Sequence, residues 1–257
     1  CFKKLARAPR FKRKDGLAPG VCAPHPKSFR LRGDLLTFPK IGKLRARVHR
    51  LPEGTAKTCT LVREHDQWFA SLQCEIEVPD PDLRVEPVVA IDRGVTNVVG
   101  DSDGVLVPRP KFYDRSMQRL ARAQRTVSRR KKGSKNREKA RARVARQHRK
   151  VRRQREHVIQ TLSHRYAKSH GTVVVEGLNT QGMLKVGGGL ARGIADAGWG
   201  LLVSCLRYKL AWSGGRLVEV PAAYSSQTCS VCGAVDAASR RGDLFFYTTG
   251  AHRDHAD

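Results

Sequence analysis

Hydrophobic and polar residues alternate along two stretches in the first third of the chain. In KLRARVHR the apolar residues Leu44, Ala46 and Val48 are separated by basic ones. In QWFASLQCEIEV, residues 67–78, every second residue from the tryptophan onward is apolar, and we expect these side chains to face inward. A period of two over such lengths predicts half-buried antiparallel strands. Residues 28–78 are therefore predicted to form a small β-barrel or sheet with a basic outer face.

The pattern changes after PDPDLRVEP, residues 79–87, a turn-rich segment that we interpret as a linker and domain boundary. The apolar runs in VVAID and TVVVE predict two buried strands, and GGRLVEVP predicts a third. Between the first two runs, residues 113–170 have a helical pattern that KKGSKN interrupts, which predicts two long helices in a hairpin. This order of strands and helices predicts a mixed α/β sheet.

A glycine-rich stretch, KVGGGLARG, precedes a helical pattern over 194–212. It has neither the G-x-x-x-x-G-K-[ST] spacing of a phosphate loop nor a strand directly before it, so we predict a flexible lid near the site. Exposed aromatic residues can stack on nucleic-acid bases. For most of the candidates we expect core packing instead; they are Trp68, Phe69, Trp199 and Trp212.

The charge of the chain points to a polyanionic partner. Fifty Lys and Arg against 23 Asp and Glu give a formal net charge of +27 and a pI of about 10.6. Nucleic acid is the first partner expected from such a field. A basic membrane-surface protein is the rival, but it would need an amphipathic or apolar anchor, and we find no long apolar run. We therefore expect no membrane partner and a cytoplasmic location.

The predicted hairpin carries much of this charge, because nearly half of residues 115–155 are Lys or Arg. Like charges four residues apart destabilise a helix, so a solvated helix pair is the less favoured interpretation. Phosphates would neutralise the repulsion, and such contacts follow the nucleic-acid backbone without reading sequence. The predicted contacts are Arg137, Arg141, Arg149 and Lys150.

Three acidic residues lie at positions where burial of a carboxylate would be energetically costly. Asp92 ends VVAID, Glu176 ends TVVVE, and Asp257 ends the chain. A strand-end acid is often only a cap or turn residue, but several brought together need a cation. Mg²⁺ prefers oxygen ligands, and two such ions can support phosphodiester hydrolysis. Gly94, shortly after Asp92, would let a phosphate backbone approach closely.

The chain has seven cysteines, an odd number, and most of them are far apart in the sequence. This pattern suggests a reducing compartment rather than a disulfide framework. Cys229 and Cys232 have C-x-x-C spacing, but no cysteine follows them to complete a four-ligand zinc site. His252 and His255 are the alternative second pair. We favour a degenerate half-site with two free thiols over bound Zn²⁺.

Four segments resemble the TnpB family, the OrfB-type proteins of insertion-sequence transposons. AIDRGVTN and VVVEGLNTQGM resemble its first two nuclease motifs, and FPKIGKLRARVHR resembles its wedge domain. YSSQTCSVCG followed by HRDHAD resembles its zinc segment running into the third motif. The resemblance implies an RNase H-like nuclease domain of the RuvC type. It also implies an acidic triad on Asp92, Glu176 and Asp257 that holds two Mg²⁺ ions, with Asp92 bridging them.

The resemblance also gives a domain division. A wedge-like β-rich domain, truncated at its N-terminus, would occupy residues 1–80 and a nuclease domain residues 87–257. The nuclease domain would contain the helical insertion 113–170 and a degenerate zinc segment, 224–256. The sequence departs from the family where two zinc-ligand cysteines are missing and where it stops at Asp257. Together with an initial Cys1 in place of Met, this suggests a fragment.

The predicted function is that of a transposon-encoded, RNA-guided DNA endonuclease, with a guide RNA and target DNA as partners. In such proteins the guide reads the sequence while the protein holds the heteroduplex backbone. Two alternatives stay open. One is an RNA-guided DNA-binding protein that does not cleave, and the other is a DNA transposase that acts without RNA. A generic basic RNA-binding protein would leave the strand-end acids unexplained.

Overall fold

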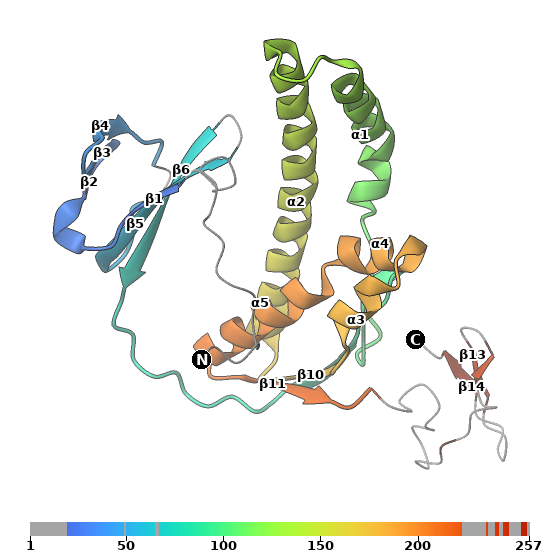
Figure 1. The fold of residues 1–257 in the computed structure, drawn as a ribbon. Coiled ribbons are helices and arrows are strands. Elements are labelled where there is room, and N and C mark those ends of the chain that lie inside the picture. Colours follow the sequence, from blue (N-terminus) through green and yellow to red (C-terminus); the bar gives the residue numbers. More distant parts are fainter. Residues whose placement is uncertain are drawn as a thin grey trace, which may run out of the picture. The chain divides into compact units, whose positions relative to one another are not determined.

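The computed structural model describes residues 20–48, 50–64, 67–222 and 235, and the backbone of three short strands near the C-terminus. The chain divides into two compact units, Cys1–Pro79 and Asp80–Asp257, which are described separately below (Figure 1). Among the described residues, no helix is both long and apolar enough to cross a membrane.

The first unit contains two antiparallel sheets of three strands each. One sheet has the order β1-β5-β6 and the other β2-β3-β4. Their bounds are β1 Gly20–Ala23, β2 Arg30–Arg32, β3 Leu35–Phe38, β4 Gly42–Arg45, β5 Thr55–Glu64 and β6 Gln67–Glu75, with a 3-10 turn at Pro26–Ser28. The small core of this unit consists of Ala23, Phe29, Leu36, Phe38, Cys59 and Leu61.

The alternation predicted for this unit is confirmed in one stretch and wrong in part of the other. Leu44 and Ala46 pack against the core. Trp68 and Ile76, in contrast, are 57% and 51% exposed. Trp68 lies on β6, an edge strand of its sheet, and Ile76 comes after that strand has ended. Burial also requires a second layer over the strand, which alternation along one strand does not supply. The described strands also form no closed barrel, because each of the two sheets keeps two unpaired edges.

A five-stranded mixed sheet of order β11-β10-β7-β8-β9 is the centre of the second unit. Strand β10 runs parallel to both β7 and β11, whereas β7, β8 and β9 are antiparallel neighbours. The bounds are β7 Val88–Asp92, β8 Asn97–Asp101, β9 Leu106–Pro108, β10 Thr172–Glu176 and β11 Arg216–Val220. This is the mixed α/β sheet that the order of elements predicts.

Five helices accompany this sheet within the described residues. They are α1 Phe112–Arg129, α2 Lys135–Ser169, α3 Thr180–Lys185, α4 Gly188–Ala197 and α5 Trp199–Trp212. Helices α1 and α2 lie side by side as the predicted hairpin (Figure 1). Helix α2 begins where the Ser134 side chain accepts a hydrogen bond of 3.2 Å from the backbone N–H of Arg137, which makes Ser134 the N-cap residue.

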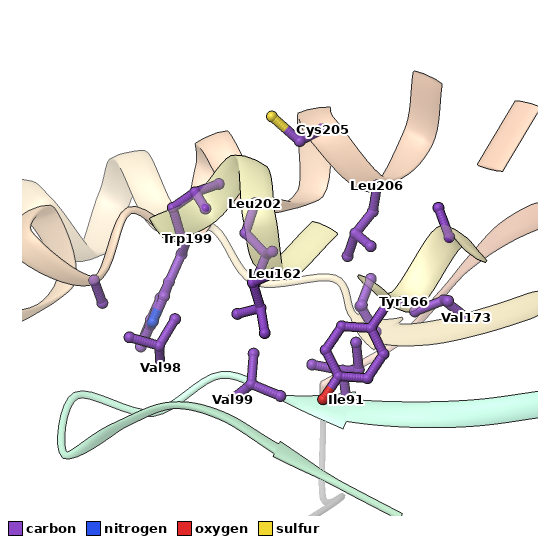
Figure 2. Packing of buried hydrophobic residues seen from close by; sticks show 14 of the residues in the cluster. Ile91, Val98, Val99, Leu162, Tyr166, Val173, Trp199, Leu202, Cys205 and Leu206 are labelled. Atoms are coloured by element: carbon purple, nitrogen blue, oxygen red, sulfur yellow. The ribbon is translucent and has the colours of Figure 1, made fainter. Parts of the chain in front are cut away.

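The core of the second unit lies between the sheet and two helices. Apolar residues of β7, β8 and β10 meet the C-terminal half of α2 and one face of α5 (Figure 2). The fully buried side chains include Val99, Val173, Ile159, Tyr166, Leu202 and Leu206, and Ile91 is 2% exposed. The hydroxyl of Tyr166 donates a hydrogen bond of 2.6 Å to Asp101 Oδ2 and so attaches α2 to β8.

The segment predicted as one helix after a glycine-rich lid is arranged differently. Helix α4 already begins at Gly188, inside that stretch, and Gly198 separates it from α5. Gly198 has a φ of 71°, a left-handed conformation that glycine adopts readily and that ends α4. The predicted lid is therefore largely the first turn of a helix.

Three short strands near the C-terminus, β12 Arg240–Arg241, β13 Leu244–Phe246 and β14 Arg253–His255, form an antiparallel sheet. Most of the predicted zinc segment, including Cys229, Cys232 and His252, lies outside the described residues, as does Asp257.

Candidate functional site

The sheet places Asp92 and Glu176 at the ends of neighbouring parallel strands. Ile91 pairs with Val175, and the two carboxylate residues follow directly as the last residues of β7 and β10. Parallel strands end at the same edge of a sheet, so the two residues lie next to each other there. Asp92 is exposed and Glu176 is half-buried, whereas Ile91 and Val175 face the helix-covered core.

The oxygens of this pair suit a hard divalent cation. Carboxylates are the ligands that Mg²⁺ prefers, and one or two of them are enough when water completes the shell. Among the residues whose positions are described, no group of three His, Cys, Asp or Glu side chains comes together. The third predicted ligand, Asp257, falls outside that set, so the described part of the site consists of two acids.

A buried arginine, Arg93, adjoins both acids. Its backbone N–H donates a hydrogen bond of 2.7 Å to Asp92 Oδ1, and its Nη2 donates to the backbone carbonyl of Glu176. Burial lowers the pKa of Arg93, and the negative charges of Glu176, Glu219 and Asp92 oppose that shift. An arginine remains protonated under such conditions. A permanent cation therefore lies within the strand ends that carry the acids.

Helices α4 and α5 hold the turn that follows Asp92. The indole Nε1 of Trp199 donates to the carbonyl of Gly94 at 3.2 Å, and α4 packs closely on Val95. A Cβ at position 94 would lie 2.8 Å from the carbonyl oxygen of Asn97, so the tight turn itself requires Gly94. The presence of glycine at position 94 is therefore explained by the turn, without the predicted close approach of a phosphate.

A second charged cluster surrounds Asp196 on α4, whose side chain is 2% exposed. Its carboxylate accepts from Arg109 at 3.2 Å, from Arg155 at 3.4 Å and from the backbone N–H of Tyr113 at 3.3 Å. Arg109 also donates from Nε to the carbonyl of Val95 at 2.7 Å. The cluster therefore connects the base of the helical hairpin to the turn that follows Asp92.

The hairpin presents basic side chains to solvent over most of its length. Arg141 and Lys150 are exposed, whereas Arg137 and Arg149 are half-buried. Arg137 donates from Nη1 to the carbonyl of Arg130 at 2.9 Å, so part of its role is to close the turn between α1 and α2. The sequence could not separate this contact from phosphate binding, because Arg137 is one of many basic residues in the hairpin.

The aromatic candidates divide in a way the sequence did not predict. Trp199 is in the core, as expected, but Trp212 is 77% exposed and Phe69 is 36% exposed. The expectation that most of these side chains pack in the core is therefore wrong. Arg93 and Asp196 are residues that the sequence analysis missed. The one signal for Arg93 was its position directly after a strand-end acid.

Two family models match parts of the chain, and a solved structure has a similar fold. Residues 71–187 match the OrfB_IS605 family, described as "Probable transposase", and residues 199–257 match the Cas12f1-like TNB domain. The fold is similar to that of Cas12f1 in a complex with guide RNA and target DNA. The TM-score is 0.51 over 71% of this chain and 39% of the other, with 19% identity.

Curated relatives make the relationship more specific. A Streptomyces pristinaespiralis protein named "Putative RNA-guided DNA endonuclease" is 41% identical over 91% of this chain. InsQ of Escherichia coli, which bears the same description, is 30% identical over 90% of this chain. The chain spans 59% and 61% of the lengths of these two relatives. These matches confirm the resemblance to the OrfB-type TnpB family.

Proposed function

We propose that the chain is the nuclease-bearing part of a TnpB-type RNA-guided DNA endonuclease that acts in the prokaryotic cytoplasm. The observation that carries this proposal is the placement of Asp92 and Glu176 at adjacent strand ends, since it pairs two oxygen ligands. The names of the relatives support the reaction class. Antiparallel strands β7–β9 continued by two parallel strands support an RNase H-like domain of the RuvC type.

In this proposal Asp92, Glu176 and Asp257 would hold two Mg²⁺ ions. When bound, these ions would activate the attacking water and stabilise the leaving oxygen. The chain's own residues hold the carboxylates in place: the Arg93 N–H orients the Asp92 carboxylate, and Trp199 fixes the following turn. Zn²⁺ has no part in this chemistry, and we propose that the Cys229–Cys232 half-site is degenerate.

The hairpin supplies the nucleic-acid contact in this proposal. Helices α1 and α2 carry exposed Lys and Arg along their length, with few acids to neutralise them. Contacts from such side chains go to phosphates and add affinity without selecting sequence. The partners are a guide RNA and target DNA, and base pairing between them supplies the specificity.

The test is a cleavage assay after RNA that co-purifies with the chain has been sequenced. A duplex that matches this RNA should be cut in Mg²⁺ by the wild type and by Asp103→Asn, an exposed acid in the turn between β8 and β9, but not by Asp92→Ala. Asp92→Ala should still bind the guide and the DNA. Equal cutting by Asp92→Ala would show that the active site has been placed wrongly.

The same assay separates the two alternatives. Guided binding of DNA without cleavage by the wild type would favour a DNA-binding protein. Tight binding to transposon ends without co-purifying RNA would favour a transposase.

A further inference from the structure

Arg93 is a cation buried between the two strand ends that carry the acids. It is 6% exposed, and its guanidinium crosses from β7 to the carbonyl of Glu176 on β10. The same residue holds Asp92 Oδ1 through its backbone N–H. One residue therefore contacts both proposed metal ligands, from the side of the sheet that the helices cover.

Core packing alone does not explain an arginine at this position. Its Nε is buried and has no hydrogen-bond partner among the described residues. An unsatisfied buried donor destabilises the folded state, and more so when it is charged. A methionine of similar length would avoid this cost, as hydrophobic replacements of buried charges often do.

The guanidinium is held from the helix side as well. Its central carbon lies 5.9 Å from the centroid of the Trp199 ring, a cation–π distance. Trp199 is itself buried and donates to Gly94, so ring, turn and guanidinium form one connected unit. These contacts fix the position of the Arg93 guanidinium, which connects the end of β7 to the end of β10.

We propose that Arg93 is the positioning residue of the metal site, because it fixes the end of β10 against the end of β7 and so sets the separation of the Asp92 and Glu176 carboxylates. This inference rests on the proposed function. Mg²⁺ tolerates little departure from octahedral geometry, so a small displacement of one strand end weakens binding. Residues that orient metal ligands typically contribute about 10–100-fold to affinity.

A purely electrostatic role for the same cation predicts the opposite result. A positive charge near two carboxylates repels an incoming cation, so its removal would tighten metal binding. The two roles are separated by comparing Arg93→Met, which removes both charge and hydrogen bonds, with Arg93→Lys, which keeps the charge but lacks the planar fork.

The experiment is calorimetric titration of the purified chain with Mn²⁺ as the probe for Mg²⁺. Arg93→Met should weaken Mn²⁺ binding by about 10-fold or more, with a smaller loss for Arg93→Lys. The matched control is Arg84→Met. Arg84 also donates to backbone carbonyls, those of Ala167 and Lys168, but beside the first residues of β10 rather than its end. The Arg84→Met variant should bind Mn²⁺ with the affinity of the wild type.

A second readout distinguishes positioning from general structural damage. In the cleavage assay, the Mg²⁺ concentration for half-maximal cutting should rise in Arg93→Lys, while affinity for nucleic acid stays that of the wild type. Circular dichroism checks that each variant is folded. If Arg93→Met does not fold, the Mn²⁺ affinity of Arg93→Lys alone tests whether Arg93 positions the metal ligands.

Mn²⁺ affinity within twofold of the wild type in a folded Arg93 variant, or tighter binding by Arg93→Met, would overturn the positioning role. Failure of the proposed function gives a different pattern. In that case the wild type and Asp92→Asn would bind Mn²⁺ equally, or neither would bind it.

Discussion

Asp92 and Glu176 are the last residues of two adjacent parallel strands, directly after the paired residues Ile91 and Val175. Two carboxylates at one sheet edge repel each other until a cation neutralises them. Asp92 is exposed to solvent and Glu176 is half-buried, and the positive charge of Arg93 beside them offsets part of this repulsion.

The carboxylate pair should make stability depend on Mg²⁺. Because the ion binds only the folded chain, saturating Mg²⁺ at about 100 times its dissociation constant should stabilise the wild type by about 2.7 kcal/mol. Asp92→Asn and Glu176→Gln should lose this gain, and the control Asp103→Asn should keep it. Thermal unfolding with and without Mg²⁺ measures the effect. A full Mg²⁺-dependent shift in Asp92→Asn would contradict the assignment.

The hairpin should bind nucleic acid with a steep dependence on salt. Each phosphate neutralised should lower log K by roughly 0.7–0.9 per tenfold rise in salt. Replacing Arg141, Arg149 and Lys150 by Gln should flatten this slope and weaken binding on all sequences alike. Arg207→Gln on α5, also an exposed arginine, is the matched control and should change little. Fluorescence anisotropy over a salt series tests this, and a loss confined to some sequences would refute backbone contact.

Asp196 should be among the most sensitive positions for stability. Asp196→Asn would remove the buried counter-charge that Arg109 and Arg155 share, which should destabilise the chain by about 3–5 kcal/mol. Asp114→Asn removes an exposed partner of the same Arg109 and should cost about 0–1 kcal/mol. Urea unfolding of the two variants makes the comparison, and equal losses would mean that burial of the Asp196 cluster has little effect.

The Tyr166–Asp101 contact should make the chain sensitive to alkaline pH. Burial, and then the hydrogen bond to Asp101, raise the pKa of Tyr166 above its ordinary value. The folded chain holds this proton more tightly, so the contribution is complete below the unfolded pKa of about 10 and is lost as pH rises above it. Each further pH unit should cost the wild type up to about 1.4 kcal/mol relative to Tyr166→Phe. Urea unfolding between about pH 9 and pH 11 tests this; parallel pH profiles for the two proteins would contradict it.

The cysteine pair gives a prediction from the sequence alone. If Cys229 and Cys232 are an orphaned half-site, the purified chain should contain no stoichiometric zinc, because two thiolates do not close a tetrahedral shell. Elemental analysis measures the metal. One zinc per chain that disappears in Cys229→Ser would refute the prediction and indicate His252 and His255 as the other ligands.

Local patterns in the sequence were enough to identify several elements of the second unit, but not β8, β9, α3 or α4. The apolar runs that end in Asp92 and Glu176 predict β7 and β10, and the KKGSKN interruption predicts the turn between α1 and α2. Such signals are local, because a buried strand or an amphipathic helix needs its apolar residues at a fixed spacing along the chain. The family motifs and the basic charge point to the function class by the same route.

Only the tertiary structure decided which residues support the acids and which pack inside. Arg93 and Asp196 are two charges in a chain with 50 Lys and Arg and 23 Asp and Glu, and nothing in their local sequence marks them as buried. Their roles depend on partners 41 to 87 residues away, such as Glu176 for Arg93 and Arg109 for Asp196. Alternation likewise predicted β6 but not the exposure of Trp68, because burial requires a second layer that the pattern of one strand cannot specify.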